Sequence, residues 1–534
     1  RAMGKLPASL RWLTALAAAL GGGFRIAPLF DQGGRLLQQW PTEDGYMLLT
    51  VSRNIALGLG MSTSAGTLPT NGVQPFATLT WALSYMLAGG DKRAGVLISL
   101  LMQTAIAAVA AVCIYQLGRR VLASHPRREA IALVAAGGWF ASSNCVPHTM
   151  NCLESGWYAL AVTLVALFFA ETDGRELSGR QQLAGGALLG WAFWVRNDAV
   201  FLILAVCLAH VIGGFLRGGL SAARQRFVTA LGFGATSVVV AAPWMISNYQ
   251  RFGHIMPISG QSESAEAVLG GNLHSIPPVM LENLTLLLPI PNALQDTMPF
   301  VALGVAGCLA GGVILHRMWR SGGHAVRVLM VLVLIYFVCL VTYYGVFFGA
   351  NHFIARYFFP TTPFTALFFG AVCVHAFTWL AGKQRAVAVA LPVVAVALVV
   401  GTQLRLYRKG SQHEHVQVIA WVLKHVPDKT WIGAPQTGTL GYFHDYTHNL
   451  DGKVNAEALR AREEDTLARY ILDKDIQYIC DWASVSDWME KMPPEFVREF
   501  DLLVHDPEQN LAVIARHGAP RLQPPRQLSR PAMH

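Results

Sequence analysis

Two adjacent carboxylates, Glu43 and Asp44, are the residues of this sequence best suited to chemistry. They follow an apolar segment by a few residues, so we expect them at a membrane surface. A carboxylate can act there as a general base and accept the proton of a hydroxyl group. Asp44 is the candidate base, and Glu43 is expected to orient the substrate or to help hold a divalent ion. The alternative is that both acids only cap a helix that begins near Gly45, where negative charge is favourable.

The residues after these acids have the pattern of an amphipathic helix. Leu48, Val51, Ile55 and Leu59 fall on one face, and polar residues fall on another. This spacing predicts a helix that lies along a lipid–water interface and does not cross the membrane.

Arg356 is the main candidate for binding an anionic group, together with His352 and Tyr357. These residues stand at one end of a hairpin between two apolar segments. Arginine makes bidentate contacts to phosphate and is costly to place at a bilayer edge without a partner. The alternative is that Arg356 extends towards lipid headgroups.

Four further polar residues follow or precede apolar segments and are candidates for substrate binding. Arg196 and Asp198 either contact a substrate or form an internal ion pair, and Glu154 either contacts a substrate or begins a helix. Arg251 opens a long loop that we expect to cover the site.

A group of polar residues near the end of the chain resembles a metal site only superficially, because its spacing fits no standard site. We expect these residues in a solvated loop, and the sequence predicts no metal site. The group consists of His444, Asp445, His448 and Asp451.

The composition indicates a membrane protein. The chain has 534 residues, of which 53% are hydrophobic and 14% charged, and its mean hydropathy is +0.39. One water-soluble core cannot hold so much apolar surface, so most of it must face lipid. The net charge of +9 does not indicate nucleic-acid binding, because the basic residues are scattered through short loops between apolar segments.

We expect about eleven membrane-spanning helices in a mainly α-helical polytopic bundle. The segment 76–89 is too short to span and is expected to be re-entrant or interfacial. The expected spans are Leu6–Ala27, Ala94–Leu117, Ala130–Val146, Leu153–Ala170, Leu183–Val195, Ala199–Leu216, Phe227–Ile246, Phe300–His316, Val328–Phe348, Thr362–Leu380 and Ala386–Leu404.

This arrangement places the basic loops on one side of the membrane, which is the cytoplasmic side by the positive-inside rule. The acidic pair, Arg356 and the residues after Arg405 then lie on the outer face. The basic residues are Lys5, Arg11, Arg119, Arg120, Arg127, Arg128, Arg175, Arg180, Arg217, Arg224, Arg226, Arg317, Arg320, Arg327, Lys383 and Arg385.

The chain divides into three parts by composition. Residues 1–405 form the membrane domain, with outer loops at 28–93 and 248–299, and residues 406–518 form a small α/β domain on the outer side. In that domain we expect a helix at 413–425, a strand at 430–434 and a helix followed by a strand at 466–480. The proline-rich tail 519–534 is expected to be disordered.

The cysteines show no metal spacing. Cys145 and Cys152 flank a turn on the outer side, where an oxidising compartment would permit a disulfide. A disulfide between them and two free thiols both remain open.

Several motifs resemble the GT-C superfamily of membrane glycosyltransferases, which includes protein O-mannosyltransferases, lipid A aminoarabinose transferases and mycobacterial arabinofuranosyltransferases. The resemblance covers most of the chain in order. Glu43 stands where many members have a second Asp, and Cys152 and Asn197 replace the more usual Gly and Pro. The motifs are Glu43-Asp-Gly-Tyr46 with Ser52-Arg-Asn-Ile-Ala56, Gly58 and Gly60, then Thr70-Asn-Gly-Val-Gln-Pro75, Asn151-Cys-Leu-Glu-Ser155, Trp194-Val-Arg-Asn-Asp198, Ile354-Ala-Arg-Tyr-Phe-Phe-Pro360, Gly438-Thr-Leu-Gly-Tyr-Phe443 and Asn449-Leu-Asp-Gly-Lys-Val-Asn455.

The resemblance implies an enzyme that transfers a monosaccharide from a polyprenyl-phosphate donor to a hydroxyl group of a glycan, glycolipid or protein. It implies a multi-pass protein of the bacterial inner membrane, with its active site and C-terminal domain in the periplasm. Asp44 would be the base of an inverting displacement, and Asn71 joins the residues expected to bind substrate. No cofactor is expected to be obligatory, although a divalent cation remains open.

Two other functions are compatible with the sequence. A flippase or transporter of lipid-linked sugars would need charged groups across the depth of the membrane, whereas the candidates here gather on one face. A non-catalytic glycan-binding membrane subunit would use the outer domain for a partner and the acids only to shape a helix.

Overall fold

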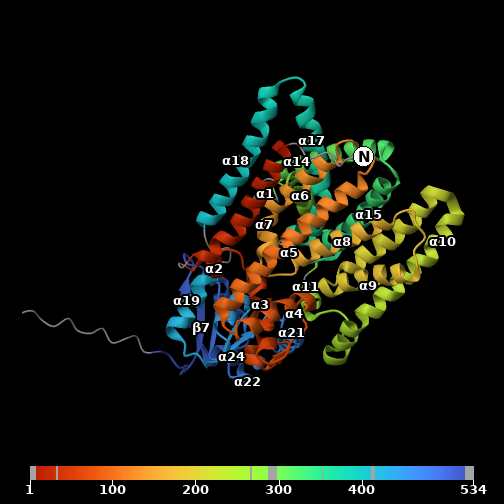
Figure 1. The fold of residues 1–534 in the computed structure, drawn as a ribbon. Helices are drawn as coiled ribbons and strands as arrows, with labels where there is room; N and C mark the ends of the chain where they lie inside the picture. The colour runs from red at the N-terminus through yellow and green to blue at the C-terminus, as the bar shows by residue number, and fades with distance from the viewer. Residues whose placement is uncertain are drawn as a thin grey trace, which may run out of the picture.

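The computed structural model describes residues 8–31, 34–264, 267–286, 297–350, 353–409 and 415–522. The chain forms a helical bundle with a five-stranded sheet at one end (Figure 1). Helix α1 (Ala8–Ile26) begins at the other end, where the turn between α17 (Thr362–Ala381) and α18 (Arg385–Lys409) also lies. The expected fold class, a membrane helical bundle with a small C-terminal α/β part, is confirmed.

Each of the eleven expected spans overlaps a helix, although the one expected at Ala130–Val146 extends beyond the end of its helix at Ala141 into α7 (Cys145–Met150). Helix α10 (Ala199–Phe252) holds two of them and is interrupted at Gly218 and Gly219, where Gly219 has a φ of +67°. Two of the expected spans, Ala130–Val146 and Leu183–Val195, correspond to short helices. These are α6 (Arg128–Ala141) and α9 (Gly179–Val195). By length and composition, seven stretches of the described chain can cross a membrane: Lys92–Val121, Ser155–Thr172, Ala199–Phe252, Met298–Ser321, His324–Phe347, Ile354–Ala381 and Ala386–Arg408.

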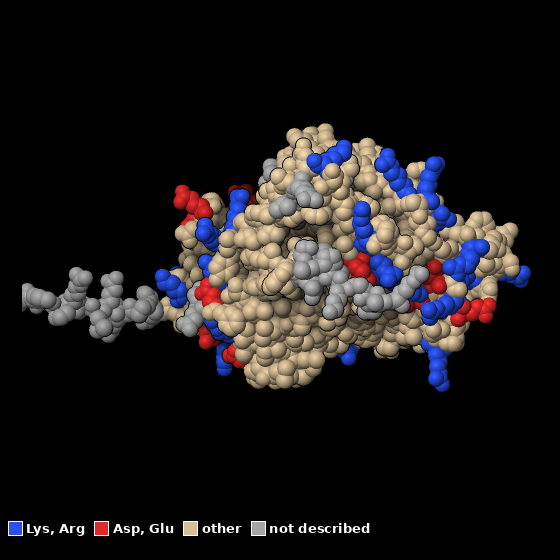
Figure 2. Space-filling view, turned by 45° about the horizontal axis from the view of Figure 1, so that its top comes forward, with Lys and Arg blue, Asp and Glu red and all other residues tan. Residues whose placement is uncertain are grey.

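The outer surface of the bundle is largely uncharged. Figure 2 shows a broad face without charged side chains and lysine and arginine side chains around its rim. Large apolar side chains are exposed along α10, α14 (Met298–Ser321) and α18. Such a surface is stable in contact with lipid and not with water.

Helix α3 (Glu43–Ala56) is enclosed by protein, so the expectation that it lies on lipid is wrong. Leu48 and Val51 are buried against the bundle, but Tyr46 on the other side is buried as well. The Tyr46 ring lies 4.8 Å from the ring of Tyr442 in α20 (Gly438–Phe443). An amphipathic pattern identifies a face that leaves water, and it cannot distinguish a lipid cover from a protein cover.

Helix α4 (Pro75–Leu87) is the short segment that we expected to be re-entrant or interfacial. It packs between α3 and α5 (Lys92–Val121). Leu79, Leu83 and Leu87 are exposed on its outer side.

The C-terminal sheet has the strand order β4-β3-β5-β7-β6. The expected helix and strands appear as α19 (Val416–His425), β3 (Ile432–Ala434), α22 (Leu467–Asp473) and β5 (Tyr478–Asp481). The strands β4 (Thr447–Asn449), β6 (Phe500–Asp506) and β7 (Leu511–Arg516) were not expected. Strands β3, β4 and β5 are parallel, and β7 pairs antiparallel with β5 and β6.

The sheet is attached to the bundle through α20 and the turn after it. The hydroxyl groups of Tyr442 and Tyr85 are 2.7 Å apart, and Tyr442 donates to the carbonyl of Lys92. Asp445 forms ion pairs with Arg53 at 3.3 Å and with Lys92 at 2.9 Å. Segments 53–92 and 442–445 are therefore held together by several polar contacts.

Two further expectations are settled by the described residues. His444 and His448 are buried, so the solvated loop that we expected there is wrong; His448 belongs to β4, and its Nδ1 lies 3.0 Å from the hydroxyl of Tyr470. Cys145 and Cys152 are both free and buried. Of the tail expected at 519–534, the part after residue 522 lies outside the described residues.

Candidate active site

Asp44 and Arg356 meet although 312 residues separate them in the chain. Arg356 Nη1 donates to Asp44 Oδ2 at 2.7 Å, and its Nη2 donates to Glu154 Oε1 at 3.3 Å. Asp44 lies in the first turn of α3, Arg356 in α16 (Ile354–Phe358), and Glu154 directly before α8 (Ser155–Thr172). One guanidinium group thus joins two carboxylates from distant segments.

A second arginine shares Glu154. Arg196 Nε lies 3.2 Å from Asp198 Oδ2 and 3.8 Å from Glu154 Oε1. Burial alone would raise the pKa of the Glu154 carboxyl, but Arg356 and Arg196 outweigh it and lower that pKa. Glu154 is therefore an ionised group between two cations, inside the protein.

Aromatic side chains form one wall of this cluster. The hydroxyl of Tyr344 donates to Asp198 Oδ2 at 2.6 Å, and the Tyr344 ring stacks on Tyr357 with centroids 4.0 Å apart. The guanidinium carbon of Arg196 lies 4.8 Å from the centre of the Tyr357 ring. Tyr357 thereby stabilises a cation through the face of its ring.

Several polar atoms of the cluster are buried and have no hydrogen-bond partner among the described residues. They include Arg196 Nη1 and Arg356 Nε, which can only donate, and one oxygen each of Glu154 and Asp198. A buried donor without an acceptor costs free energy, and most buried polar groups in proteins are paired. The two guanidinium groups therefore retain N–H donors that can bind an anionic group.

Gly45 explains why Asp44 and Glu154 come close to each other. A Cβ atom at Gly45 would overlap the carbonyl oxygen of Asn151, so only glycine lets α3 approach the segment before Glu154. Thr42 caps α3 by accepting a hydrogen bond from the Gly45 amide, and its own amide donates to the carbonyl of Asn151. The first turn of α3, which carries Asp44, is thus held against the segment that precedes Glu154.

Glu43 points away from this cluster, towards the C-terminal sheet. Its carboxylate accepts hydrogen bonds from the amides of Gly438 and Thr439 at the start of α20 and from the Thr439 hydroxyl. His415 lies 3.6 Å from the same carboxylate. Burial raises the pKa of Glu43, and the contacts with His415 and Thr439 offset only part of that rise.

The other residues singled out from the sequence lie at varying positions. Asn71 is buried, and its Oδ1 accepts a hydrogen bond from the amide of Ile258 at the start of α11 (Ile258–Ser264). Arg251 is exposed in the last turn of α10. His352 lies outside the described residues.

Tyr344 contacts Asp198 of the cluster, and Lys453, paired with Glu263, lies by Phe353 beside Arg356. The sequence reasoning did not select these three residues as site residues. Lys453 lies in the segment Asn449–Asn455, which was noticed as a motif, so this motif was an available signal. Tyr344 lies within an apolar span, and nothing in its immediate sequence distinguishes it from a lipid-facing tyrosine.

The donor set does not favour a metal. Within the described ranges, no three His, Cys, Asp or Glu side chains are grouped so that they could hold a metal ion. The carboxylates of the cluster are paired with arginine instead.

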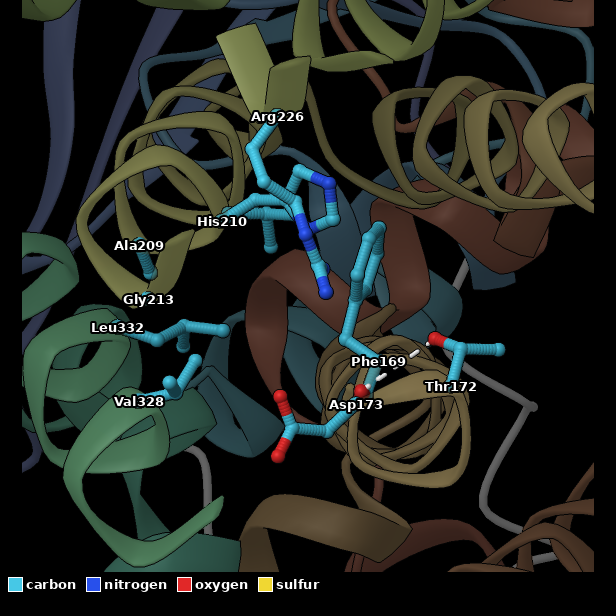
Figure 3. Close-up of a pocket in the computed structure, with 10 residues that line it drawn as sticks. Phe169, Thr172, Asp173, Ala209, His210, Gly213, Arg226, Val328 and Leu332 are labelled. Carbon is cyan, nitrogen blue, oxygen red and sulfur yellow. Dashed lines mark hydrogen bonds between the residues drawn. The ribbon is translucent and has the colours of Figure 1, made fainter. Parts of the chain in front are cut away.

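A cavity also lies at the opposite end of α8, and it is separate from this cluster. Asp173, His210 and Arg226 line it together with apolar side chains (Figure 3). Asp173 follows α8, whereas Glu154 precedes it.

Comparison with known proteins identifies one matching domain family and several structures of similar fold. Residues 402–519 match a domain family described as Domain of unknown function (DUF8728). A search of curated proteins found no match.

Solved structures cover nearly the whole chain. ArnT from Cupriavidus metallidurans bound to undecaprenyl phosphate is 11% identical with a TM-score of 0.61, and the match covers 95% of this chain and 98% of ArnT. The archaeal oligosaccharyltransferase AglB from Archaeoglobus fulgidus, in complex with an inhibitory peptide and a dolichol-phosphate, is 12% identical with a TM-score of 0.51 and coverages of 93% and 72%. An Archaeoglobus fulgidus oligosaccharyltransferase structure with Zn and sulfate has 13% identity and a TM-score of 0.54, with coverages of 95% and 74%. ArnT and AglB belong to the GT-C superfamily, and the expected GT-C fold is confirmed.

Proposed function

We propose that this chain is a membrane glycosyltransferase that moves a monosaccharide from a polyprenyl-phosphate donor to a hydroxyl group of a glycan, glycolipid or protein. The observation that carries the proposal is the meeting of Asp44, Glu154, Arg196 and Arg356 at one site beside the candidate membrane helices. The site combines a carboxylate suited to proton transfer with cations suited to a phosphate. Relatives of the same fold have been solved with undecaprenyl phosphate and dolichol-phosphate, which supports this class of donor.

In the proposed reaction, Asp44 accepts the proton of the acceptor hydroxyl, and the oxygen of that hydroxyl attacks the anomeric carbon of the donor. The bond between that carbon and the phosphate oxygen breaks, and the bonding electrons leave with the polyprenyl phosphate. A single displacement inverts the configuration at the anomeric carbon and needs one carboxylate base.

Arg356 has two roles in this scheme. Its Nη1 orients Asp44 at 2.7 Å, and its Nε, which has no partner among the described residues, donates to the negatively charged leaving group. Arg196, held by Asp198 and Glu154, adds a second N–H donor. Arginine N–H groups stabilise the charge that develops on the phosphate as the sugar leaves.

We assign the site to the periplasmic face of a bacterial inner membrane. The basic loops in the sequence alternate with the candidate spans in the pattern of cytoplasmic loops. The C-terminal sheet lies at the end of the bundle away from the start of α1. The active site is close to the sheet, since Glu43 contacts α20 and Asp44 contacts Arg356.

The Asp44→Asn variant tests this function. The full chain in lipid nanodiscs is incubated with a labelled polyprenyl-phosphate monosaccharide and a cell-envelope extract as the source of acceptors. We expect transfer to fall by about 10²–10⁴-fold, because the general base is lost, while binding of polyprenyl phosphate is retained.

Asp487→Asn is the matched control, because Asp487 forms an exposed ion pair with Lys491 away from the cluster. This control should transfer the sugar at the wild-type rate. Undiminished transfer by Asp44→Asn would remove the proposed mechanism. A wild-type chain that neither binds polyprenyl phosphate nor transfers the sugar would remove the function.

A further inference from the structure

Lys453 brings a cation from the C-terminal sheet to the proposed active site. Its Nζ lies 2.7 Å from Glu263 in α11 and 3.9 Å from Asp451. The same Nζ lies 5.8 Å from the centre of the Phe353 ring, and the guanidinium carbon of Arg356 lies 5.7 Å from that ring. Lys453 and Arg356 therefore reach one aromatic side chain from two different parts of the chain.

The backbone around Lys453 is held firmly against the bundle. A Cβ atom at Gly72 would overlap the carbonyl oxygen of Lys453, so the two segments are in direct backbone contact. The Lys453 amide donates to Asp451 Oδ1 at 2.9 Å, which closes a tight turn after β4. The position of the Lys453 backbone is thus fixed, whereas its side chain can move by rotation about its four side-chain bonds.

The electrostatic surroundings of Lys453 favour its charged form. Burial lowers the pKa of its amino group, but the carboxylates of Asp451, Glu263 and Asp44 outweigh burial and raise the pKa above its usual value. Its charge thus interacts with the proposed base as well as with the carboxylate of α11. A lysine ammonium is a compact charge on a flexible stem and readily exchanges one anionic partner for another.

Arg356 is less able to exchange partners, because Asp44 and Glu154 both bind it. The proposed reaction leaves a phosphate with one more negative charge than the donor had. Binding that charge calls for a cation that can leave its resting partner.

We infer that the segment after β4 of the C-terminal sheet is part of the active site, and that its Lys453 binds the phosphate of the polyprenyl carrier after leaving Glu263 of α11. The inference rests on the proposed function and adds the residue and the segment that complete its phosphate site. Glu263 is then a resting partner that competes with the phosphate for Lys453. The sheet acts directly on substrate through Lys453 and does not serve only as an attached module.

Two substitutions with opposite expected effects test the inference. Binding of polyprenyl phosphate to the full chain in nanodiscs is measured without any acceptor, with inorganic phosphate as a competitor. Lys453→Gln should weaken binding about tenfold, and Lys453→Arg should preserve it. Glu263→Gln should strengthen binding about threefold, because the competing carboxylate is gone; a purely structural ion pair would not give this gain.

The chain offers a matched control pair in the same sheet unit. Lys474 and Glu457 form an ion pair of the same length, 2.7 Å, and both side chains are more exposed. Lys474→Gln and Glu457→Gln should leave binding unchanged. Competition by millimolar inorganic phosphate would show that the phosphate alone is recognised, whereas its failure to compete would show that the lipid-linked form is required.

The outcomes separate this inference from the proposed function. If Arg356→Gln abolishes binding while Lys453→Gln and Glu263→Gln both leave it unchanged, the inference is overturned and the proposed function stands. If Lys453→Gln and Glu263→Gln weaken binding equally, the ion pair is structural and the inference is again overturned. If the wild-type chain does not bind polyprenyl phosphate, the proposed function itself fails.

Discussion

The two ends of α8 each carry a cluster of charged side chains, and the two clusters differ in how completely their groups are paired. Before the helix, Glu154 lies between Arg196 and Arg356. After it, Asp173 pairs with His324 at 2.9 Å and with Arg217 at 3.4 Å.

The side chains that pair with Asp173 have further partners among the described residues, and in the same cavity only His210 Nε2 is a buried polar atom without one. His324 Nδ1 contacts Asp173, and its Nε2 lies 2.9 Å from the carbonyl oxygen of Gly213. Arg217 is 41% exposed, so water solvates much of it. This cluster connects α8, α10 and α15 (His324–Leu340), and its contacts are explained by packing alone.

The cluster before α8 is buried, and it keeps donors and acceptors without partners among the described residues. Burial with incomplete pairing is costly, so stability alone does not explain such an arrangement. The comparison teaches that charge by itself does not identify a site. The cluster before α8 is distinguished by two buried guanidinium groups that keep N–H donors without partners among the described residues.

Arg196→Met should have the largest effect on this comparison. Its removal leaves Glu154 and Asp198 buried with one cation fewer, which should destabilise the fold by about 3–5 kcal/mol. Arg217→Met, its more exposed counterpart in the cluster after α8, should cost about 1 kcal/mol or less. Thermal and denaturant unfolding in detergent measure both, and equal losses would show that the clusters do not differ in this way.

Gly45→Ala should have the next largest effect. The added methyl group would push α3 away from Asn151 and displace Asp44 from Arg356. A displacement of about 1 Å at a reacting group can lower the rate about 100-fold. Gly23→Ala is the control, because nothing lies within 4 Å of a Cβ at Gly23; transfer that survives in Gly45→Ala would mean that the first turn of α3 adapts.

Asp173→Asn should weaken the second cluster without affecting transfer. The carboxylate is partly exposed, and its loss should cost about 1 kcal/mol of unfolding free energy. Sugar transfer at the wild-type rate would sharpen the contrast between the two ends of α8. A loss of transfer comparable to that of Asp44→Asn would erase it.

Asp451 should give the smallest effect, through pH. Burial raises the pKa of its carboxyl to about 6, and Lys453, Asn449 and Arg462 offset part of the rise. Glu263 also faces this group across Lys453. The folded protein then holds a proton on Asp451 between about pH 4 and 6 that the unfolded chain releases, so its contribution to the unfolding free energy grows as pH falls through this range.

The Asp451→Asn variant isolates that contribution. The wild-type chain should gain about 1 °C in unfolding temperature relative to the variant between pH 7.5 and 5.0. Parallel pH profiles for the two proteins would show that Asp451 titrates at its ordinary value.

Much of the bundle could be predicted from sequence because apolar length is a direct property of a spanning helix. All eleven expected spans overlap helices, and the motif at 354–360 contains Arg356, which the structure brings to Asp44. The sequence could not show that α3 is covered by α20 and not by lipid, since both covers select the same apolar residues. Nor did it predict β4, β6 and β7. Strand β4 has only three residues, and β6 and β7 depend on antiparallel pairing within the sheet.

The site was only partly visible for a similar reason. Asp44, Glu154, Arg196 and Arg356 stand out as charged residues next to apolar segments, where charge is expensive. Lys453 lies in a polar segment where a lysine is ordinary, and only the fold brings it to Phe353. Adjacent in sequence, Glu43 and Asp44 gave no sign that one would contact the sheet and the other an arginine.

The contact between Glu43 and the amide of Gly438 joins residues 395 positions apart in the chain. A ribosome must therefore translate almost four hundred further codons before the first turn of α3 can meet its partner. Until that segment has emerged and docked, the Glu43 carboxylate lacks the amide and hydroxyl donors at the start of α20. A chain that ends upstream of the sheet would leave this carboxylate without those donors, so the first turn of α3 depends on the last part of the chain to be synthesised.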